Sequence, residues 1–366
     1  MYPSFIVEYG VAPHHLSKKV FIGIVKWLRE TRVEAKHTGR KLEADALKIV
    51  INRIYGALND AMDYLYDPEC TYTVTINLQL LLCGLIEAFE LNNFDVLSAN
   101  TDGLLVRLPL NRQGVFKHIC NEWSVYSKLD LETEKFEKYC RSAVNDYIAV
   151  GYGFYDALQE YNRCGVWIDS KGNTYITRQA IEDKFIKFKG YFLQDPEYNK
   201  GFVYPVVKKA LKEYFLYGVD ITEFIRNYIN TSRTAIYDYC FSQKVAGKYT
   251  TIYKTVRDGK PVYIKCQKHN RFYICKSGGG AITKAIVPDS DNIAYGDDIS
   301  GIVVEEEKSL VAGQRVALFN DYEYKEDYNL NYGFYINEAY KILYGNGKTG
   351  KGERRGINNN SNNLFS

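Results

Sequence analysis

Two short apolar runs, FDVLS and LLVRL, lie on either side of Ala99-Asn100-Thr101-Asp102-Gly103, between Phe94 and Leu108. This pattern predicts a β-hairpin with Asp102 at its tip, because glycine accepts a positive φ and aspartate tolerates one. A turn without further function is the simplest interpretation of the hairpin alone. Basic residues at helical spacing upstream favour a functional site, because a carboxylate that faces cations is the arrangement of phosphoryl-transfer sites.

Two helices are expected upstream of the hairpin, from just after Pro13 to about Lys36 and from about Leu42 to Leu58. Their apolar stripes recur at helical spacing, with Val20, Ile24 and Leu28 in the first and Leu47, Ile51, Ile54 and Leu58 in the second. The short break at residues 37–40 predicts an antiparallel helical hairpin that brings Arg32, Lys36 and Lys48 together. Taken singly, each of these cations is more simply a solvated helix position.

Together these stretches resemble a family B DNA polymerase of a phage-like kind. The segment Asn100-Thr101-Asp102-Gly103 is similar to the D-T-D-S hairpin of that family, with the metal-binding aspartate kept as Asp102 and the other replaced by Asn100. The resemblance implies that Asp102 is the catalytic metal ligand.

A second segment resembles the fingers motif K-x-x-x-N-S-x-Y-G with its preceding Arg and Lys; its residues here are Arg32, Lys36, Lys48, Asn52, Tyr55 and Gly56. In the family the cations bind the triphosphate of the incoming nucleotide, and the Tyr-Gly pair packs around the nascent base pair. Arg53 stands where the family usually has serine. The resemblance therefore implies a nucleotide-binding site that contains these six residues together with Tyr2.

The first residues, Tyr2-Pro3-Ser4, resemble the end of the first palm motif, D-x-x-S-L-Y-P-S. Tyr2 then occupies the position whose ring excludes a ribose 2′-hydroxyl. The catalytic aspartate of that motif would lie five positions before Tyr2, and the family's exonuclease and amino-terminal regions would also precede this sequence. We therefore expect a truncated or split polymerase, with a separate amino-terminal polymerase or exonuclease polypeptide as a further partner if the enzyme is split.

Three downstream segments extend the resemblance. Leu131–Phe136 is similar to an L-E-F-E-K segment, which makes Glu134 a second candidate metal ligand, with a solvated acidic turn as the alternative. Ala143–Val150 falls where the family has a K-K-x-Y strand along the primer duplex. Lys184–Gly190 resembles its K-x-K-G element and is expected here as a strand with its cations, Lys184, Lys187 and Lys189, along one face. An ordinary edge strand guarded by lysines is the alternative for the last segment. The DNA-binding residues that the resemblance implies are Asn145, Tyr147, Lys187, Lys189 and Gly190.

The remaining segments set the organisation of the chain. A helix from Thr75 to about residue 91 is apolar on nearly every face and is expected to be buried beneath the sheet, and another helix is expected over 112–129. A hairpin is expected over 164–176, amphipathic helices over 204–243, and strands from Gly247 to about Tyr344. The Gly-rich stretch 345–352 is no phosphate-binding loop, because Gly352 replaces the required Ser or Thr and no apolar helix follows.

Composition limits the alternatives. The net charge of +3, from 47 basic and 44 acidic residues, predicts that any nucleic-acid surface is local. Eight scattered cysteines and five histidines indicate reduced, mostly buried thiols, with neither a disulfide framework nor a zinc site. No signal peptide is recognised and no segment is expected to reach the length of a membrane span, so we expect a soluble, cytoplasmic protein without a membrane partner, in the host cytoplasm if it is phage-encoded.

These observations predict an α+β fold with polymerase right-hand architecture: an antiparallel palm sheet, helical-hairpin fingers and a helical thumb with an appended small β region. The expected domains are palm (1–12), fingers (13–58), palm (59–190), thumb with the β-rich region (191–345) and a disordered tail (346–366). The expected function is template-directed nucleotidyl transfer from a dNTP to a primer 3′-hydroxyl in phage genome replication, with two Mg²⁺ ions as cofactors and primer-template DNA as partner. The alternative is a noncatalytic DNA-binding remnant of a polymerase.

Overall fold

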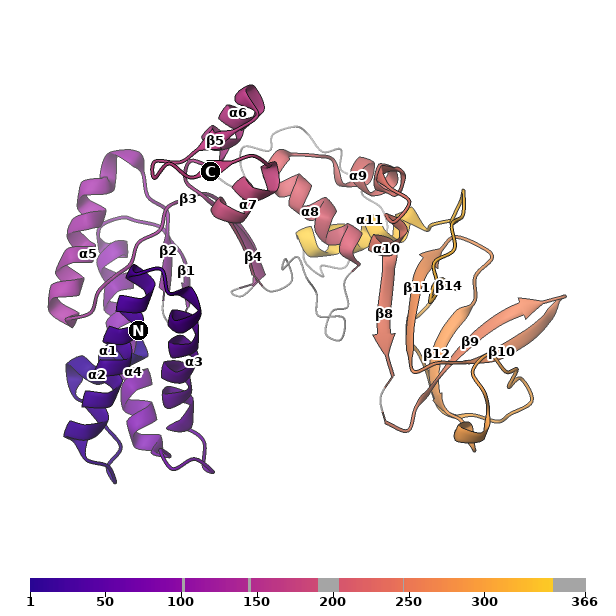
Figure 1. Ribbon diagram of the computed structural model, residues 1–366, viewed down its shortest axis with the longest axis horizontal. Helices are drawn as coiled ribbons and strands as arrows, with labels where there is room; N and C mark the ends of the chain where they lie inside the picture. The colour runs from indigo at the N-terminus through magenta and orange to yellow at the C-terminus, as the bar shows by residue number, and fades with distance from the viewer. Residues whose placement is uncertain (101–102, 144–145, 190–203, 246, 345–366) are drawn as a thin grey trace. The chain divides into compact units, whose positions relative to one another are not determined.

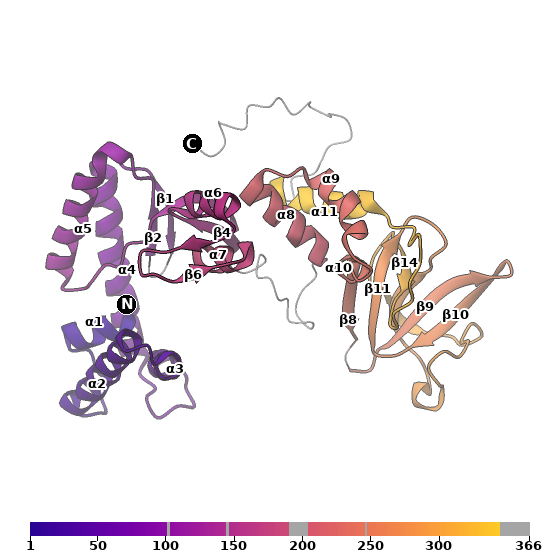
Figure 2. The same ribbon diagram turned by 45° about the horizontal axis from the view of Figure 1, so that its top comes forward.

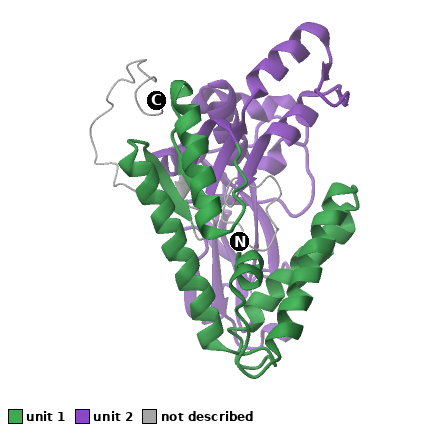
Figure 3. Ribbon diagram, turned by 90° about the vertical axis from the view of Figure 1, so that its left-hand side faces the viewer, with its two compact units in different colours: residues 1–134 green, residues 135–366 purple. Residues whose placement is uncertain are grey.

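A computed structural model describes residues 1–100, 103–143, 146–189, 204–245 and 247–344. The chain divides into two compact units, unit 1 over Met1–Glu134 and unit 2 over Lys135–Ser366 (Figure 3). Helices and sheets occur in both, and every strand pair among the described residues is antiparallel, as expected for an α+β protein. The division at 134/135 falls inside the segment 59–190 that was predicted as one palm domain.

Unit 1 is a helical body with one hairpin (Figure 1). Its elements are α1 (Tyr2–Tyr9), α2 (Lys18–His37), α3 (Lys41–Ala57), α4 (Pro68–Leu91), β1 (Val96–Asn100), β2 (Gly103–Val106), η1 (Leu110–Arg112) and α5 (Gln113–Ser127). Helix α1 contacts α2, α3 and α4, and Phe5 and Ile6 on α1 are almost completely buried in the core of the unit. The first helix is therefore an integral part of this core.

The predicted helical hairpin is confirmed as α2 and α3, which pack against each other across a turn at Gly39, where φ is 75°. The stripe predicted for α3 faces inward, with Ile51 buried and Leu58 just beyond the helix end at 0% exposure. The stripe predicted for α2 is confirmed at Leu28 and wrong at Val20 and Ile24. Its buried residues are Phe21, Val25, Leu28 and Ala35, whereas Val20 and Ile24 are 59% and 50% exposed. The apolar arc of α2 is wide, and packing against the rest of unit 1 selects the part that carries the larger Phe21.

Helix α4 differs from the expectation in its start and in its burial. It begins at Pro68 because the side chain of Asp67 caps it by accepting a hydrogen bond from the Cys70 amide. Only one stripe is buried, including Val74, Leu78 and Leu85, while the opposite face is exposed. With 24 residues, α4 is also long and apolar enough to cross a membrane by length and composition alone, so the expectation that no segment reaches that length is wrong. Its buried stripe belongs to the core of unit 1.

The predicted β-hairpin is confirmed as β1 paired with β2. Asn100 at the end of β1 pairs with Gly103 at the start of β2, so two positions lie between the paired strands. Those positions, Thr101 and Asp102, lie outside the described residues. The hairpin is joined to the body of unit 1 through α4, whose last residues contact β1.

Unit 2 begins with the three-stranded sheet β3-β4-β7, formed by β3 (Phe136–Ala143), β4 (Asp146–Gly151) and β7 (Ile186–Lys189). Between β4 and β7 lie α6 (Phe154–Cys164), the predicted small hairpin of β5 (Trp167–Ile168) and β6 (Thr174–Tyr175), and α7 (Arg178–Phe185). The strand predicted from Lys184 is shorter than expected, because Thr177 caps α7 and the helix continues through Lys184 and Phe185. Lys184 is therefore a helical residue.

The helices α8 (Pro205–Tyr217), α9 (Ile221–Asn227) and α10 (Ile236–Tyr239) confirm the predicted helices, together with the short η3 (Tyr228–Thr231). The helical stretch ends at Tyr239 and not near Gln243, because a strand begins at Cys240. The segment to Tyr344 does not end in strands, because α11 (Tyr332–Tyr344) is a helix that packs against α8 and α9 (Figure 2). Tyr335 and Ala339 are both fully buried, at the spacing of one helical turn. The Tyr335 hydroxyl donates to the Tyr239 carbonyl at 2.8 Å and accepts from the Ile274 amide at 2.9 Å.

The β-rich region contains two sheets, β14-β11-β8 and β10-β9-β12-β13. Their strands are β8 (Cys240–Lys244), β9 (Thr250–Arg257), β10 (Lys260–Cys266), β11 (His269–Cys275), β12 (Ala281–Ile286), β13 (Glu305–Ser309) and β14 (Arg315–Leu318), with a short η4 at Ser290–Asn292. Gly280 bridges to Val316 on β14 through two backbone hydrogen bonds of 2.9 and 2.8 Å. A β-carbon on Gly280 would lie 2.2 Å from the Lys254 carbonyl oxygen, so only glycine allows this close approach of the two sheets.

All eight cysteines are unpaired and five of them are buried, which confirms the expected thiols. The predicted disordered tail, 346–366, lies outside the described residues.

Substitution of Gly280 tests the contact between the two sheets. Gly280→Ala should lower the free energy of unfolding of unit 2 by about 1–3 kcal/mol, because the added methyl group has no space without a backbone shift. Urea unfolding followed by circular dichroism measures this change. Gly301→Ala is the matched control, since a β-carbon there meets no atom within 4 Å. Equal stability of the two variants would contradict the proposed role of Gly280.

Candidate functional site

Two residues of the predicted nucleotide site are in direct contact. The rings of Tyr2 on α1 and Tyr55 on α3 are stacked, with their centroids 4.1 Å apart and an angle of 4° between their planes. Both side chains are half-buried, so the ring pair is accessible from solvent. Such stacking contributes about 0.5–1.5 kcal/mol beyond the burial of the rings. The pair joins the first motif to the fingers motif.

A chain of hydrogen bonds positions Tyr55. The hydroxyl of Thr71 donates to the Asp67 carbonyl at 3.2 Å, and the hydroxyl of Thr75 donates to the Thr71 carbonyl at 2.8 Å. Since the single proton of Thr75 is used in this way, the Tyr55 hydroxyl at 2.7 Å donates to Thr75 Oγ1. The start of α4 thus determines where the ring pair lies.

Asp67 is the buried carboxylate at the beginning of this chain, at 7% exposure. Besides capping α4, it accepts hydrogen bonds from the backbone amide and from Nδ1 of His14, each at 2.8 Å. Burial favours a higher pKa of Asp67, but the hydrogen bonds from the Cys70 and His14 amides and from the His14 ring outweigh it and lower the pKa to about 2. The hydrogen bond to Asp67, with its negative charge, raises the pKa of His14. Neither residue was a sequence-predicted site residue, although the Asp-Pro pair is a recognisable helix start.

The predicted triphosphate cations lie on both helices of the α2–α3 hairpin. Lys36 lies 3.8 Å from Glu132, and both side chains are largely exposed, at 66% and 90%. Arg32 is half-buried, and its Nε is shielded from solvent without a hydrogen-bond partner. Lys48 and Asn52 are exposed, and among the described residues neither side chain takes part in a hydrogen bond or ion pair. The hairpin therefore offers positively charged groups that are available to an anion.

The two remaining positions of the fingers motif behave differently. Arg53, which replaces the family serine, donates to Asp60 and Asp63 at 3.2 and 3.0 Å and so fixes the loop after α3. Gly56 lies inside α3 without a positive φ, and a β-carbon there would meet no atom within 4 Å. The fold itself therefore does not require glycine at position 56.

The predicted metal ligands are only partly described. Asp102 lies outside the described residues, and Glu134 is exposed at the end of unit 1. In the part of the chain that the structure describes, no three His, Cys, Asp or Glu side chains gather where they could hold an ion. Since Mg²⁺ prefers near-octahedral oxygen ligands, the described residues alone do not provide a fitting site.

Three of the five predicted DNA-binding residues, Tyr147, Lys187 and Lys189, share one face of the β3-β4-β7 sheet. Arg141, Tyr147 and Lys189 lie directly opposite one another across the three strands. The Lys189 ammonium lies 5.9 Å from the centroid of the Tyr147 ring, which stacks on Tyr139 at 4.9 Å. The next row carries Lys187, opposite Ala149. We call this face, with Tyr139, Arg141, Tyr147, Lys187 and Lys189, the sheet surface.

The opposite face of the same sheet is apolar, because Ile148, Val150 and Ile186 are buried in the core of unit 2. The alternation along the strands therefore directs the cations outward. Cations interleaved with aromatic rings are typical of nucleic-acid surfaces. Sequence reasoning missed Arg141 and Tyr139, since β3 carried no recognised motif; Asn145 and Gly190 lie outside the described residues.

Lys184 is not part of the sheet surface. Its ammonium forms an ion pair with Asp169 and donates to the Tyr175 hydroxyl at 3.1 Å, next to the Trp167 ring. The hydrogen bond from Lys184 comes first among the interactions that hold the pKa of Asp169 well below its usual value. Lys184 therefore holds the β5–β6 hairpin against α7, and the expectation that it aligns with Lys187 and Lys189 is wrong.

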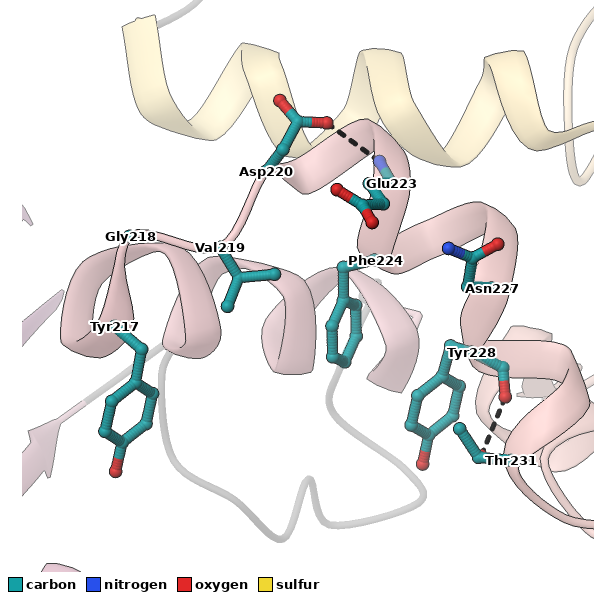
Figure 4. Close-up of a pocket in the computed structure, with 9 residues that line it drawn as sticks. All are labelled: Tyr217, Gly218, Val219, Asp220, Glu223, Phe224, Asn227, Tyr228 and Thr231. Atoms are coloured by element: carbon teal, nitrogen blue, oxygen red, sulfur yellow. Dashed lines mark hydrogen bonds between the residues drawn. The ribbon is translucent and has the colours of Figure 1, made fainter.

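A separate hollow of about 670 Å³ lies at the junction of α8, α9 and η3 (Figure 4). Tyr217, Phe224 and Tyr228 direct their rings to the same side of it, and the last two are stacked at 5.2 Å. Asp220 and Glu223 also line the hollow, with Gly218, Val219, Asn227 and Thr231. None of the sequence-predicted residues that the structure describes lies there.

Unit 1 thus presents a cationic helical hairpin with a tyrosine pair, and unit 2 a basic, aromatic sheet face. No family model matches the sequence, and no curated protein matches it. Among solved structures, the chain is similar to the family B DNA polymerase from the hyperthermophilic archaeon Pyrobaculum calidifontis, with a TM-score of 0.46 and 12% sequence identity. The similarity extends over 94% of this chain and 44% of that one, so the chain spans less than half the length of that polymerase.

The contact between His14 and Asp67 predicts a defined pH dependence of stability. A raised histidine pKa contributes stability fully below its ordinary value of 6.5, and this contribution is lost as the pH rises through the raised pKa. The lowered pKa of Asp67 contributes stability above the ordinary value of 3.8, and this contribution is lost as the pH falls toward 2. The pair therefore stabilises unit 1 most between about pH 4 and pH 6.

Thermal unfolding of His14→Gln tests this dependence. The variant should melt below the wild type at pH 5.5, and the difference should shrink by pH 9. His118 also pairs with a carboxylate, Glu122, but both side chains are largely exposed and the pair contributes little. The Tm difference between His118→Gln and the wild type should therefore be small and nearly the same at both pH values. A His14→Gln effect of equal size at both pH values would exclude an ionic contribution.

Proposed function

We propose that this chain binds primer-template DNA and an incoming deoxynucleoside triphosphate, as the palm, fingers and thumb part of a family B-like DNA polymerase. The observation that carries the proposal is the Tyr2–Tyr55 stack at 4.1 Å. The family resemblance requires these two residues, which are far apart in the sequence, to lie on the same nascent base pair. An arbitrary assignment of the two motifs would not lead to their contact.

The charges of the α2–α3 hairpin support the triphosphate part of the proposal. The unpartnered Nε of Arg32 is desolvated, and an unmet donor of this kind costs about 1–3 kcal/mol that an anion would recover. Lys48 is exposed and has no partner among the described residues. In the proposed role, Arg32, Lys36 and Lys48 bind phosphate oxygens, while the ring of Tyr2 limits the space at the sugar.

The sheet surface of unit 2 would contact the duplex. Lys187 and Lys189 would bind backbone phosphates, and Tyr147 would lie against a groove or sugar edge. Mg²⁺ is proposed as the cofactor, with Asp102 as the ligand that the resemblance supplies. In a polymerase, that ion would stabilise negative charge during nucleotidyl transfer.

The second candidate function is a noncatalytic DNA-binding module that retains the polymerase architecture. The arrangement of the described carboxylates favours this function, because they form no metal-binding group by themselves. The two functions differ in one measurable property: only a polymerase site binds the dNTP that is complementary to the template.

The first experiment measures this property on a primer-template whose primer ends in a dideoxynucleotide. The next complementary dNTP should tighten DNA binding by the wild-type chain, and a mismatched dNTP should not. Lys48→Ala should weaken the binding of the dNTP roughly tenfold, since a charge-assisted contact to phosphate is lost, and should change DNA affinity without dNTP less than twofold.

Lys41→Ala is the matched control, because Lys41 is an exposed lysine on the same helix outside the motif. A larger effect of Lys48→Ala on DNA affinity than on dNTP binding would show that the fingers assignment is wrong. If the complementary dNTP does not tighten DNA binding by the wild-type chain, the noncatalytic module is favoured.

The second experiment tests the sheet surface with Lys187→Gln/Lys189→Gln. Loss of two phosphate contacts should reduce the slope of log K against log salt by roughly 1.8 for duplex DNA and weaken binding at low salt. Fluorescence anisotropy with a labelled duplex between 50 and 200 mM salt measures both. The control, Lys260→Gln/Lys276→Gln, removes the same charge from exposed positions in the β-rich region and should leave the slope unchanged.

A further inference from the structure

A cluster of three lysines lies in the β-rich region of unit 2, where β12 pairs with β13 and the chain enters β9. It consists of Lys248, Lys284 and Lys308, together with Tyr249 and Glu306, and we call it the lysine cluster. The Lys284 and Lys248 ammonium groups lie 5.0 and 5.7 Å from the centroid of the Tyr249 ring. Lys248 and Lys308 are exposed and Lys284 is half-exposed, so solvent reaches all three.

Two of these lysines form a like-charge pair within the sheet. Lys284 on β12 is directly opposite Lys308 on β13, so both side chains emerge on the same face. Directly opposed side chains have β-carbons about 4.5–5.5 Å apart, and like charges at that separation repel each other. A sheet that keeps such a pair has a local excess of positive charge.

The one carboxylate in the lysine cluster is hydrogen-bonded to Lys248 and Tyr249, and it also interacts electrostatically with Lys308. Glu306 accepts from Lys248 at 2.9 Å and from the Tyr249 hydroxyl at 2.6 Å. Its φ of 47° is unusual for a residue other than glycine, and the β12–β13 register shifts nearby, which is typical of a bulge that re-aims a side chain. Across the described part of the chain, no carboxylate forms an ion pair with Lys284 or Lys308.

A neighbouring lysine of the same sheet provides a contrast. Lys254 on β9 forms an ion pair with Glu307 at 2.6 Å and lies 4.5 Å from the Tyr263 ring, so its charge is neutralised within the fold. The lysine cluster has three positive charges and one negative charge, and the neighbouring Glu305 also acts electrostatically on Lys248. This accessible face therefore keeps a net charge of +1 when Glu305 is counted with the cluster. The fold therefore neutralises Lys254 but leaves Lys284 and Lys308 available to an external anion.

We propose that the lysine cluster binds consecutive phosphate groups of a DNA backbone, with Lys284 and Lys308 as the phosphate-binding residues. The inference rests on the proposed function in that the chain binds DNA, and it adds a contact outside the predicted DNA-binding residues. Consecutive phosphates relieve the repulsion between the two ammonium groups, which makes a polyanion a better ligand than a single carboxylate. Single-stranded and duplex DNA share this chemistry, so both are tested.

The experiment uses the full chain and two fluorescein-labelled probes, a 20-nucleotide oligothymidylate and a 20-base-pair duplex. Lys284→Gln/Lys308→Gln should weaken binding of the preferred probe roughly tenfold at 100 mM salt and reduce its salt slope by about 1.4 for single-stranded or 1.8 for duplex DNA. Glu306→Gln, which removes the one negative charge, should tighten binding of the same probe. Lys260→Gln/Lys276→Gln serves as the charge-matched control and should leave that slope unchanged.

Thermal unfolding provides the control for folding. Removal of the like-charge pair should leave the Tm of the free variant equal to or above that of the wild type, while the stabilisation by added DNA should decrease. The proposal for the lysine cluster would be overturned, and the proposed function retained, by one result. In it, the salt slope is unchanged in Lys284→Gln/Lys308→Gln but reduced in Lys187→Gln/Lys189→Gln. If neither pair affects DNA binding, both proposals fail. Competition by polyglutamate as strong as that by oligothymidylate would show a site for acidic protein segments and would also overturn the inference.

Discussion

The arrangement of unit 1 depends on the hydrogen bonds that the carboxylate of Asp67 accepts. This carboxylate caps α4 and also binds the His14 amide and ring, so it fixes the start of the longest helix against the loop after α1. From that start, hydrogen bonds lead through Thr71 and Thr75 to the Tyr55 hydroxyl. A buried carboxylate with several donors is stabilised as the anion, which is why its pKa falls to about 2 despite its burial. The position of the tyrosine pair therefore depends on the Asp67 cap at the start of α4, to which Thr71 and Thr75 link it.

The two candidate surfaces are built in different ways. In unit 1, long side chains extend from helices, and their positions depend on the relative rotation of α2, α3 and α4. In unit 2, the register of three strands fixes Arg141, Tyr147 and Lys189 in one row, because alternation sends every second side chain to the same face. A rigid row suits a repeating duplex backbone, whereas a helical hairpin suits a ligand that enters and leaves. This difference agrees with the roles proposed for the two surfaces.

Sequence reasoning succeeded where local chemistry determines the structure. The α2–α3 hairpin follows from two apolar stripes and a break at Gly39, and the β1–β2 hairpin follows from alternation around Asp102-Gly103. The contact of Tyr2 with Tyr55 could be anticipated only through the family resemblance, because neither residue carries a local signal for the other.

The failures occurred where tertiary contacts decide between local alternatives. The tyrosines and isoleucines near Tyr335 favour a strand. Helix α11 forms instead, because Tyr335 and Ala339 bury one helical face in the core of unit 2. Lys184 lies in the same basic and apolar stretch as Lys187 and Lys189, but the helix that Thr177 caps continues through Lys184, where Asp169 binds it. The phase of the stripe on α2 was likewise decided by packing in unit 1, since both candidate stripes are apolar. Only side-chain contacts distinguish such cases.

The small net charge of +3 and the local cationic surfaces are consistent with each other, because 44 acidic residues offset the 47 basic ones and some described lysines and arginines pair directly with a carboxylate. The ion pair between Lys36 and Glu132 illustrates how such a neighbour can serve binding. Both side chains are exposed, so the pair contributes only about 0–1 kcal/mol. A triphosphate carries more charge than one carboxylate and forms stronger charge-assisted hydrogen bonds, so it would displace Glu132 at little cost. An exposed acidic partner of this kind keeps a cation from binding anions indiscriminately while leaving it available to a multiply charged ligand.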